Sequence, residues 1–222
     1  MRSTMTTGRE DRRDNYRLQA QQAKKHFLTY DQQELIRRCR LRFDPAYFYI
    51  RFLSQSYRIC RKTGNMERLQ DGTWVDGNSF GEVMTILDWL CDSRADRYIT
   101  GRWGNIVSRG PAFHRQLQEG EDPDAARFCR DPEGFCAACE ALGGEKMSGA
   151  DFAYAIELVD GLQILVQLWF ADEDFPAQLQ LLWDENVARY IRYETTWYAA
   201  GLLIGRIRNM MDAQDTKRGD GL

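Results

Sequence analysis

Three successive carboxylates, Asp172-Glu173-Asp174, stand just ahead of Phe175-Pro176 in an otherwise apolar part of the sequence. Segments with strand periodicity precede and follow them, which predicts a loop between two strands. Carboxylates on such a loop can bind a hard cation, or share a proton and act as acid and base. A polar loop after a buried strand also carries acidic residues for solvation alone, so both interpretations stay open.

A second group suited to ligand contact is the Arg102-Trp103 pair, which lies between Gly101 and Gly104. An arginine beside an aromatic ring can stack on a planar ligand and pair with its anionic group. The segment is not a phosphate-binding loop, because the Gly-Lys-Ser/Thr ending is missing. With two histidines and no Gly-x-Ser-x-Gly, the sequence offers little for nucleophilic catalysis, and His26 is expected at the surface.

Cys129, Cys136 and Cys139 form the one cysteine cluster in the sequence, with His114 nearby. Thiolates at this spacing could hold zinc or part of an iron–sulfur cluster. However, the four-cysteine signatures are absent, and the residues around Cys136 are typical of an apolar helix. We therefore expect Cys136 and Cys139 to be buried and metal-free, and all the cysteines to be reduced thiols rather than a disulfide framework.

The elements that would position these groups are clearest late in the chain. Apolar residues alternate over 152–158, 162–170 and 179–183, with a turn at Asp160-Gly161. This pattern predicts a three-stranded antiparallel meander. In the middle strand we expect the core-facing residues to be Ile164, Val166 and Leu168.

The opposite face of this meander carries side chains that offer hydrogen bonds and a stacking plane. They are Gln163, Leu165, Gln167 and Trp169 on the middle strand, and Gln178, Gln180 and Leu182 on the last strand. Such a face is either a ligand groove, or it is solvated or covered by a helix.

The remaining elements are mostly helices, with one hairpin. Periodicity and end signals predict helices over 14–28, from Asp31 through Cys39, from a capping box at Ser79 and Glu82 to Leu90, from Pro111 past His114, over 123–142 with an interruption at Pro132, and over 194–211. Residues 47–53 and 57–60 predict a β-hairpin joined at 54–56. The fold class is therefore α+β, with an antiparallel sheet (the hairpin plus the three-stranded meander) and helices packed on one face.

Composition predicts one folded domain. The chain has 222 residues, of which 43% are hydrophobic, enough to fill a sizeable core. No linker interrupts it, so we expect a single α+β domain over 11–212 with disordered tails at 1–10 and 213–222. The N-terminal residues contain no apolar run and no stretch is long enough to span a bilayer, so we expect a soluble, cytoplasmic protein that does not contact membranes.

Charge is unevenly distributed along the chain. Through Lys62 there are 15 Lys/Arg against 6 Asp/Glu, and the remainder has 15 against 27. A basic segment can bind phosphate, nucleic acid or an acidic protein. It can also mix with acidic residues over one surface. No nucleic-acid-binding motif accompanies the charge, so we expect no nucleic-acid partner.

Three stretches, "SFGEVMTILDWL…YITGRWGNI", "FCAACEALGG" and "LQILVQLWFADEDFPAQLQLLWDENVARYI", together resemble the family called domain of unknown function 3786. The similarity covers roughly 14–208. Its most specific parts are Gly101-Arg102-Trp103 and the acidic loop with the strand after it. The resemblance implies a setting in anaerobic bacteria and archaea. Some members carry an added four-cysteine iron–sulfur module like those of corrinoid proteins, which this chain lacks, and no catalytic residue is implied.

Three hypotheses for function follow. The first, which we favour, is a non-catalytic accessory domain in anaerobic, corrinoid-linked metabolism. It would bind a small molecule, such as a corrinoid or another planar cofactor, or a redox or corrinoid partner protein. The second is an enzyme that uses the acidic loop, with or without a metal. The third is a protein-interaction module that uses the basic N-terminal segment.

The two segments most specific to the resemblance also predict where a ligand binds. We expect the Arg102-Trp103 segment and the acidic loop to lie together at the mouth of a pocket. Trp169 and the glutamine face would border this pocket. Arg102 would pair with Asp172 or Asp174 when no ligand is bound.

Overall fold

The computed structural model describes residues 7–105 and 122–219, with side chains over 15–105 and 122–214. The described residues form two compact units. Unit 1 comprises those up to Arg97 together with Arg189–Ala199, and unit 2 comprises Tyr98–Ala188 and those from Ala200 onward. Along the sequence, unit 1 therefore comes first, most of unit 2 follows, and residues 189–199 belong to unit 1 again. That residues 11–212 form a single domain stays a prediction.

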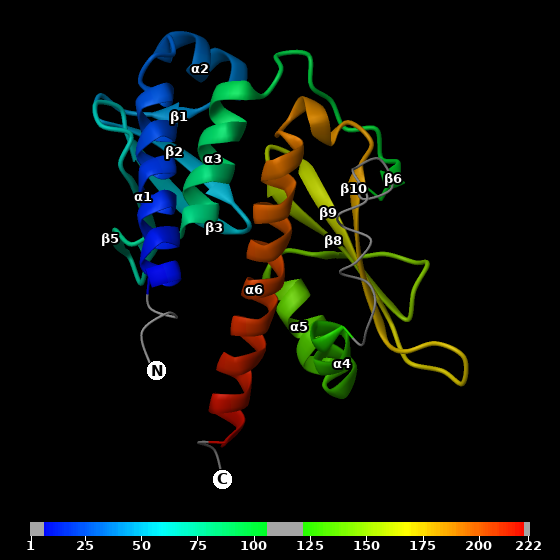
Figure 1. Cartoon of the computed structure of the whole chain (residues 1–222). Helices are drawn as coiled ribbons and strands as arrows, with labels where there is room; N and C mark the ends of the chain where they lie inside the picture. Colours follow the sequence, from blue (N-terminus) through cyan, green and yellow to red (C-terminus); the bar gives the residue numbers. More distant parts are fainter. Residues whose placement is uncertain (1–6, 106–121, 220–222) are drawn as a thin grey trace. The chain divides into compact units, whose positions relative to one another are not determined.

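The helices of unit 1 include those that the sequence predicts, although the first of them begins seven residues before its predicted start at residue 14. They are α1 (Thr7–Phe27), α2 (Gln32–Cys39), α3 (Phe80–Asp92) and the first residues of α6 (Tyr193–Gly219) (Figure 1). The Asp31 side chain accepts hydrogen bonds from the backbone N–H groups of Gln33 and Glu34, which caps α2. Ser79 and Glu82 form both halves of the predicted capping box at α3.

Sheet A of unit 1 has five antiparallel strands in sequence order. They are β1 (Arg42–Phe43), β2 (Tyr47–Phe52), β3 (Gln55–Cys60), β4 (Met66–Gln70) and β5 (Thr73–Val75). The predicted hairpin is β2–β3. Its turn is shorter than expected because Leu53 and Ser54 both adopt positive φ angles, 45° and 61°, as in a two-residue hairpin turn.

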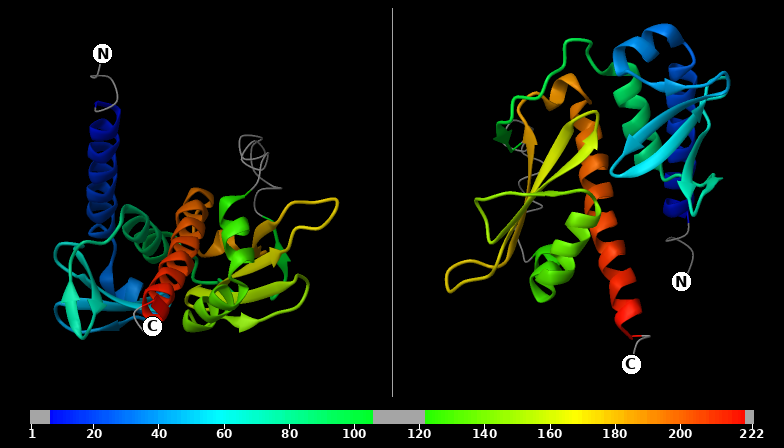
Figure 2. Two further views of the ribbon diagram at one scale, coloured as in Figure 1. Left: turned by 90° about the horizontal axis from the view of Figure 1, so that it is seen from below. Right: turned by 180° about the vertical axis from the view of Figure 1, so that it is seen from behind.

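Strand alternation gives sheet A two different faces. The inner face is the core of unit 1, formed by Phe48, Ile50, Phe52, Tyr57 and Ile59, which are all buried. The α1 helix packs there, since the rings of Phe27 and Phe48 meet edge to face at 6.1 Å. The α3 helix joins through the Tyr57 hydroxyl, which donates to Glu82 at 2.5 Å. Seen from behind, the strands lie in front of α1 and α3 (Figure 2, right).

Sheet B of unit 2 contains the predicted meander and two short edge strands. Its strands are β6 (Trp103–Gly104), β7 (Glu145–Lys146), β8 (Phe152–Val159), β9 (Leu162–Trp169) and β10 (Gln178–Asp184), in the order β6-β10-β9-β8-β7. The α+β class is therefore confirmed. The expectation that the hairpin and the meander share one sheet is wrong, because each pairs with local short strands instead.

The core of unit 2 lies on one face of sheet B. Ile164, Val166 and Leu168 are fully buried, as predicted. Two helices, α4 (Pro123–Arg130) and α5 (Pro132–Ala141), are separated by the predicted interruption at Pro132. On α5, the Phe135 ring meets the ring of Tyr154, which shares this face through its pairing with Val166. The helix pair therefore covers this face.

The ends of the described chain are helical. Helix α1 starts at Thr7 and α6 runs to Gly219, so both helices include residues that the sequence assigns to tails. In unit 2, α6 forms an ion pair to α4 between Arg208 and Asp124. A 3-10 turn, η3 (Val187–Arg189), precedes α6. The helix expected from Pro111 past His114 lies outside the described residues. Among the described helices, none combines the length and apolar character needed to cross a membrane.

The Tyr57 hydroxyl tests how strongly unit 1 depends on its buried polar contacts. In Tyr57→Phe the buried Glu82 carboxylate loses a donor, so we expect the unfolding free energy to fall by about 1–3 kcal/mol. The matched control is Tyr49→Phe. Its hydroxyl donates to Asp44 on the solvent-facing side of sheet A, so its loss should lower the unfolding free energy by clearly less. Urea unfolding measures both, and equal losses would contradict the prediction.

Candidate functional site

The two segments expected to form one site lie at opposite ends of β10. At one end Trp103 pairs with Asp184, which places Arg102 beside the end of the strand. At the other end Gln178 pairs with Trp169, and the acidic loop closes this β9–β10 hairpin. The seven residues of β10 span about 20 Å at roughly 3.3 Å per residue. The expectation that both segments share a pocket mouth is therefore wrong (Figure 1).

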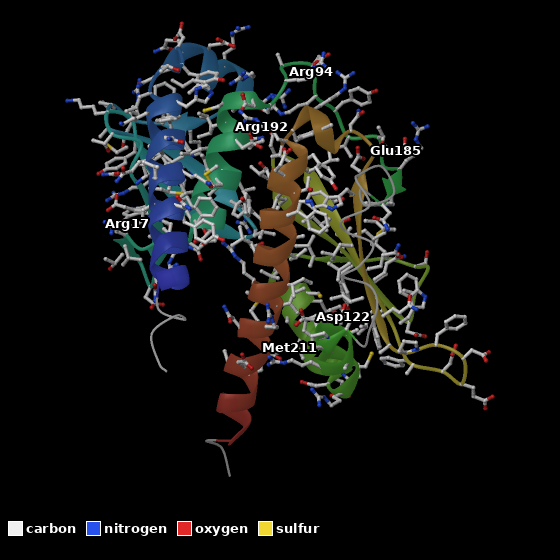
Figure 3. All side chains as sticks on the ribbon, viewed as in Figure 1. Arg17, Arg94, Asp122, Glu185, Arg192 and Met211 are labelled. Atoms are coloured by element: carbon white, nitrogen blue, oxygen red, sulfur yellow. The ribbon has the colours of Figure 1, made fainter. Side chains whose placement is uncertain are left out.

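Arg102 pairs with Glu185 instead of Asp172 or Asp174. Its Nε and Nη2 atoms each lie 2.8 Å from Glu185 Oε2, and the Glu185 N–H donates to the Arg102 carbonyl at 3.0 Å. The Arg102 side chain is 73% exposed, and an exposed pair of this kind contributes only about 0–1 kcal/mol. Figure 3 labels Glu185 near β6.

Asp184, which sequence reasoning missed, orders this segment. It is 2% exposed, and its Oδ2 atom accepts three hydrogen bonds of 2.9 Å, from the Thr100 N–H, the Thr100 hydroxyl and the Gly101 N–H. A buried carboxylate with this many donors fixes a loop. The sequence did contain a signal for this residue, because Asp184 is the acidic residue that ends the alternating strand β10.

Asp172 is used within the acidic loop itself. Its Oδ1 atom accepts from the N–H groups of Asp174 at 2.9 Å and Phe175 at 2.7 Å. Such side chain-to-backbone bonds define a compact turn. Glu173 and Asp174 are exposed, and Phe175 is 62% exposed. The loop is therefore a preformed turn that presents carboxylates and an aromatic ring.

The glutamine face of sheet B is closed at its centre. Gln167 is only 7% exposed and donates to the Gly149 carbonyl at 3.3 Å, and Leu165 is also buried. Gln163 and Trp169 are partly buried. Of the two alternatives left open by the sequence, this part of the face fits the covered one, because the segment around Gly149 contacts its centre.

The clustered cysteines differ from one another. Cys139 is fully buried, as predicted, but Cys136 is only partly buried and lines a shallow hollow of about 300 Å³. Cys129 donates a weak bond to the Trp169 carbonyl, with sulfur and oxygen 3.6 Å apart. Across the described side chains, no three His, Cys, Asp or Glu residues converge as metal ligands. His114 lies outside the described residues.

A larger hollow, of about 440 Å³, opens between α1 and α3 of unit 1. Its apolar lining consists of Ala23, Met84, Leu87 and Cys91. Its polar lining consists of Gln19, Gln22, His26, Asp88, Asp92 and Arg192. Ligand pockets combine an apolar lining with a few convergent polar groups in this way.

A continuous chain of polar groups runs along this hollow. The Tyr30 hydroxyl lies 3.3 Å from His26 Nε2 and donates to Asp92 Oδ1 at 3.2 Å. Arg192 Nη2 donates to the other oxygen of Asp92. Arg192 Nε lies 3.1 Å from Asp88 Oδ1, and the Arg192 backbone N–H donates to Asp88 Oδ2 at 2.8 Å. Arg192, labelled in Figure 3, thus bridges two carboxylates one helical turn apart.

Burial shifts the pKa values of the groups that line the hollow. It raises the pKa of Asp88, against the opposing effects of Thr195 and Arg192. Burial lowers the pKa of Arg192, but Asp92 and Asp88 outweigh it and leave that pKa raised. Burial, helped by Asp92, raises the pKa of the Cys91 thiol to about 12. The hollow thus combines a firmly charged guanidinium with two carboxylates and an un-ionised thiol.

Sequence reasoning missed this hollow, although a signal was present. Asp88 and Asp92 are four residues apart in α3, and the residues between them and just before them are almost all apolar. This spacing places both carboxylates on one face. An acid that follows Ile86 and Leu87 directly needs a partner, and here the partner is Arg192. His26 is exposed, as expected, but lines the hollow.

The raised pKa of Asp88 predicts a pH dependence. Because its pKa in the folded state lies above the ordinary value of 3.8, protonated Asp88 favours folding. That contribution is fully present below pH 3.8 and is lost as the pH rises through the raised pKa. From about pH 4 to 7, the unfolding free energy of the wild type should therefore fall relative to Asp88→Asn. Urea unfolding at each pH measures this difference, and a constant or growing advantage of the wild type would contradict the prediction.

The thiols should differ in reactivity. A hydrogen bond with the Thr63 hydroxyl lowers the pKa of Cys60, which is partly exposed, whereas burial raises the pKa of Cys91 and Cys139. Since the thiolate is the nucleophile, iodoacetamide at neutral pH should alkylate Cys60 well before Cys91 or Cys139. Peptide mass spectrometry measures the order, with urea-unfolded protein as the control. Equal rates for Cys60 and Cys91 in folded protein would contradict it.

No curated protein and no solved structure matches the chain. A family model does match, over residues 31–206, which include most of both units. The chain therefore belongs to the family described as a domain of unknown function, DUF3786.

Proposed function

We propose that this chain is a non-catalytic domain that binds a small polar ligand in the hollow between α1 and α3. One observation carries the proposal. Asp92 lies in the wall of the hollow, held between the Tyr30 hydroxyl and the Arg192 guanidinium. The volume of about 440 Å³ lies within the range of roughly 300–1,000 Å³ that is usual for small-molecule sites.

The same contacts suggest how a ligand is held. The Arg192 side chain is 57% exposed, so its guanidinium can turn toward an anionic or carbonyl group of a ligand. Asp92 then accepts a hydrogen bond from a donor on that ligand. The backbone of Arg192 stays anchored, because its N–H group bonds to the buried Asp88. This anchoring favours binding by limiting the conformational freedom that the site loses.

Binding is better supported than catalysis. The high pKa of Cys91 keeps its thiol protonated, and Asp88 is engaged by Arg192. The enzyme hypothesis based on the acidic loop loses support because Asp172 is used to shape its own turn. A planar ligand of one or two rings suits the volume of the hollow. The anaerobic setting, a corrinoid and a redox or corrinoid partner protein remain predictions from the resemblance.

Ligand-observed NMR tests the proposal with mixtures of amino acids, nucleobases, amines, small carboxylates and cobalamin. A compound that binds the wild type should bind at least about tenfold more weakly to Asp92→Asn and Arg192→Gln, because a charged hydrogen bond contributes about 1.5–3 kcal/mol. The matched control is Arg94→Gln, an exposed arginine outside the hollow that pairs with Asp96.

Two outcomes would contradict the proposal. One is that every compound found binds equally well to the wild type and to both hollow variants. The other is that Arg94→Gln weakens binding as much as Arg192→Gln, which would point to a general loss of charge rather than a site.

A further inference from the structure

The outer face of sheet A carries aromatic and arginine side chains. Strand alternation and register place Arg42, Tyr47, Tyr49, Arg51, Arg58 and Trp74 there, opposite the buried inner face. We call these six residues the aromatic–arginine face. Tyr, Trp and Arg are the residues most enriched where proteins bind one another tightly.

The centre of this face is already ordered. The Arg58 guanidinium lies over the Tyr47 ring at 4.2 Å and over the Trp74 ring at 4.9 Å. Its Nε atom also bonds to Glu67 at 2.6 Å, which neutralises its charge locally. The rings of Tyr49 and Trp74 are 6.0 Å apart. Because these side chains hold one another, little further conformational entropy is lost when a partner docks.

Two arginines beside this centre keep their charge available. Arg42 lies directly opposite Tyr49 on β1, and Arg51 follows Tyr49 by two residues on β2. Both are exposed, and neither has an ion pair within the described part of the chain. Between Arg42 and Val75 there are six Lys/Arg against three Asp/Glu. The face therefore suits a partner that combines carboxylates with an apolar side chain.

The acidic loop of unit 2 has this chemistry. Between Phe170 and Ala177 it contains three carboxylates and no basic residue. Asp172 holds the turn, which leaves the exposed Glu173 and Asp174 for a partner, next to a Phe175 side chain that is 62% exposed. The loop is preformed, so it also loses little entropy on docking.

We propose that the acidic loop of one copy of this chain binds the aromatic–arginine face of a second copy. Glu173 and Asp174 pair with Arg42 and Arg51, and Phe175 packs against Tyr49 and Trp74. The contact joins two different surfaces, so it is a head-to-tail association. It is independent of the hollow between α1 and α3, and so of the proposed ligand.

Sedimentation velocity over a concentration series tests this association. The wild type should self-associate at low salt and dissociate as salt rises to about 0.5 M, because exposed charges are then screened. Arg42→Glu/Arg51→Glu should weaken self-association at least about tenfold, because it opposes like charges. The matched control is Arg37→Glu/Arg94→Glu, which reverses two exposed arginines outside sheet A. Circular dichroism checks that each variant is folded.

A charge exchange makes the test specific. Glu173→Arg/Asp174→Arg should also fail to self-associate, yet it should bind the Arg42→Glu/Arg51→Glu chain when the two are mixed. A wild type that stays monomeric at all concentrations overturns the proposal. So does self-association that the face and loop variants leave unchanged. Binding of a synthetic peptide of residues 170–177 to a monomeric wild type would assign the face to a different acidic protein, and would likewise overturn it.

Discussion

The carboxylate of Glu82 lies where sheet A meets α3, and the rest of unit 1 depends on how it is satisfied. It is 6% exposed and accepts hydrogen bonds from the Ser79 N–H and the Tyr57 hydroxyl. A buried charge is tolerated only when donors surround it, so these contacts fix the start of α3 against the inner face of the sheet. The direction of α3 then decides where Asp88 and Asp92 lie, and so decides the wall of the hollow.

Acidic side chains do comparable structural work elsewhere in the chain. Asp184 accepts hydrogen bonds from Thr100 and Gly101 at the end of β10, as Glu82 accepts them from Ser79 and Tyr57 in unit 1. Asp172 shapes its own turn in the same way. The carboxylates discussed above therefore divide into two groups. One group holds backbone in place, and the other, with Asp92, Glu173 and Asp174, contacts a ligand or a second copy in the two proposals.

Local features of the fold were predictable, and pairings between distant segments were not. The capping box at Ser79 and the burial of Ile164 follow from patterns of a few residues, and both are confirmed. The strand alternation around Trp169 was also correct. What sequence patterns do not contain is which strand the Arg102 segment joins. That segment pairs at the end of β10 far from the acidic loop, so a site built on their proximity was wrong. The hollow was missed because Arg192 comes from a distant segment.

The return of residues 189–199 to unit 1 has a consequence for how the protein is made. The backbone N–H of Arg192 bonds to Asp88, although the two residues are 104 positions apart in the sequence. During synthesis, α3 therefore leaves the ribosome long before Arg192 is translated. Until then, the Asp88 carboxylate is hydrated instead of bonded to Arg192. Unit 1 is completed only after most of unit 2 has been translated. A fragment that stops at Arg97 would contain the residues of sheet A, α1 and α3, but it would lack Arg192, which bridges the two carboxylates of α3.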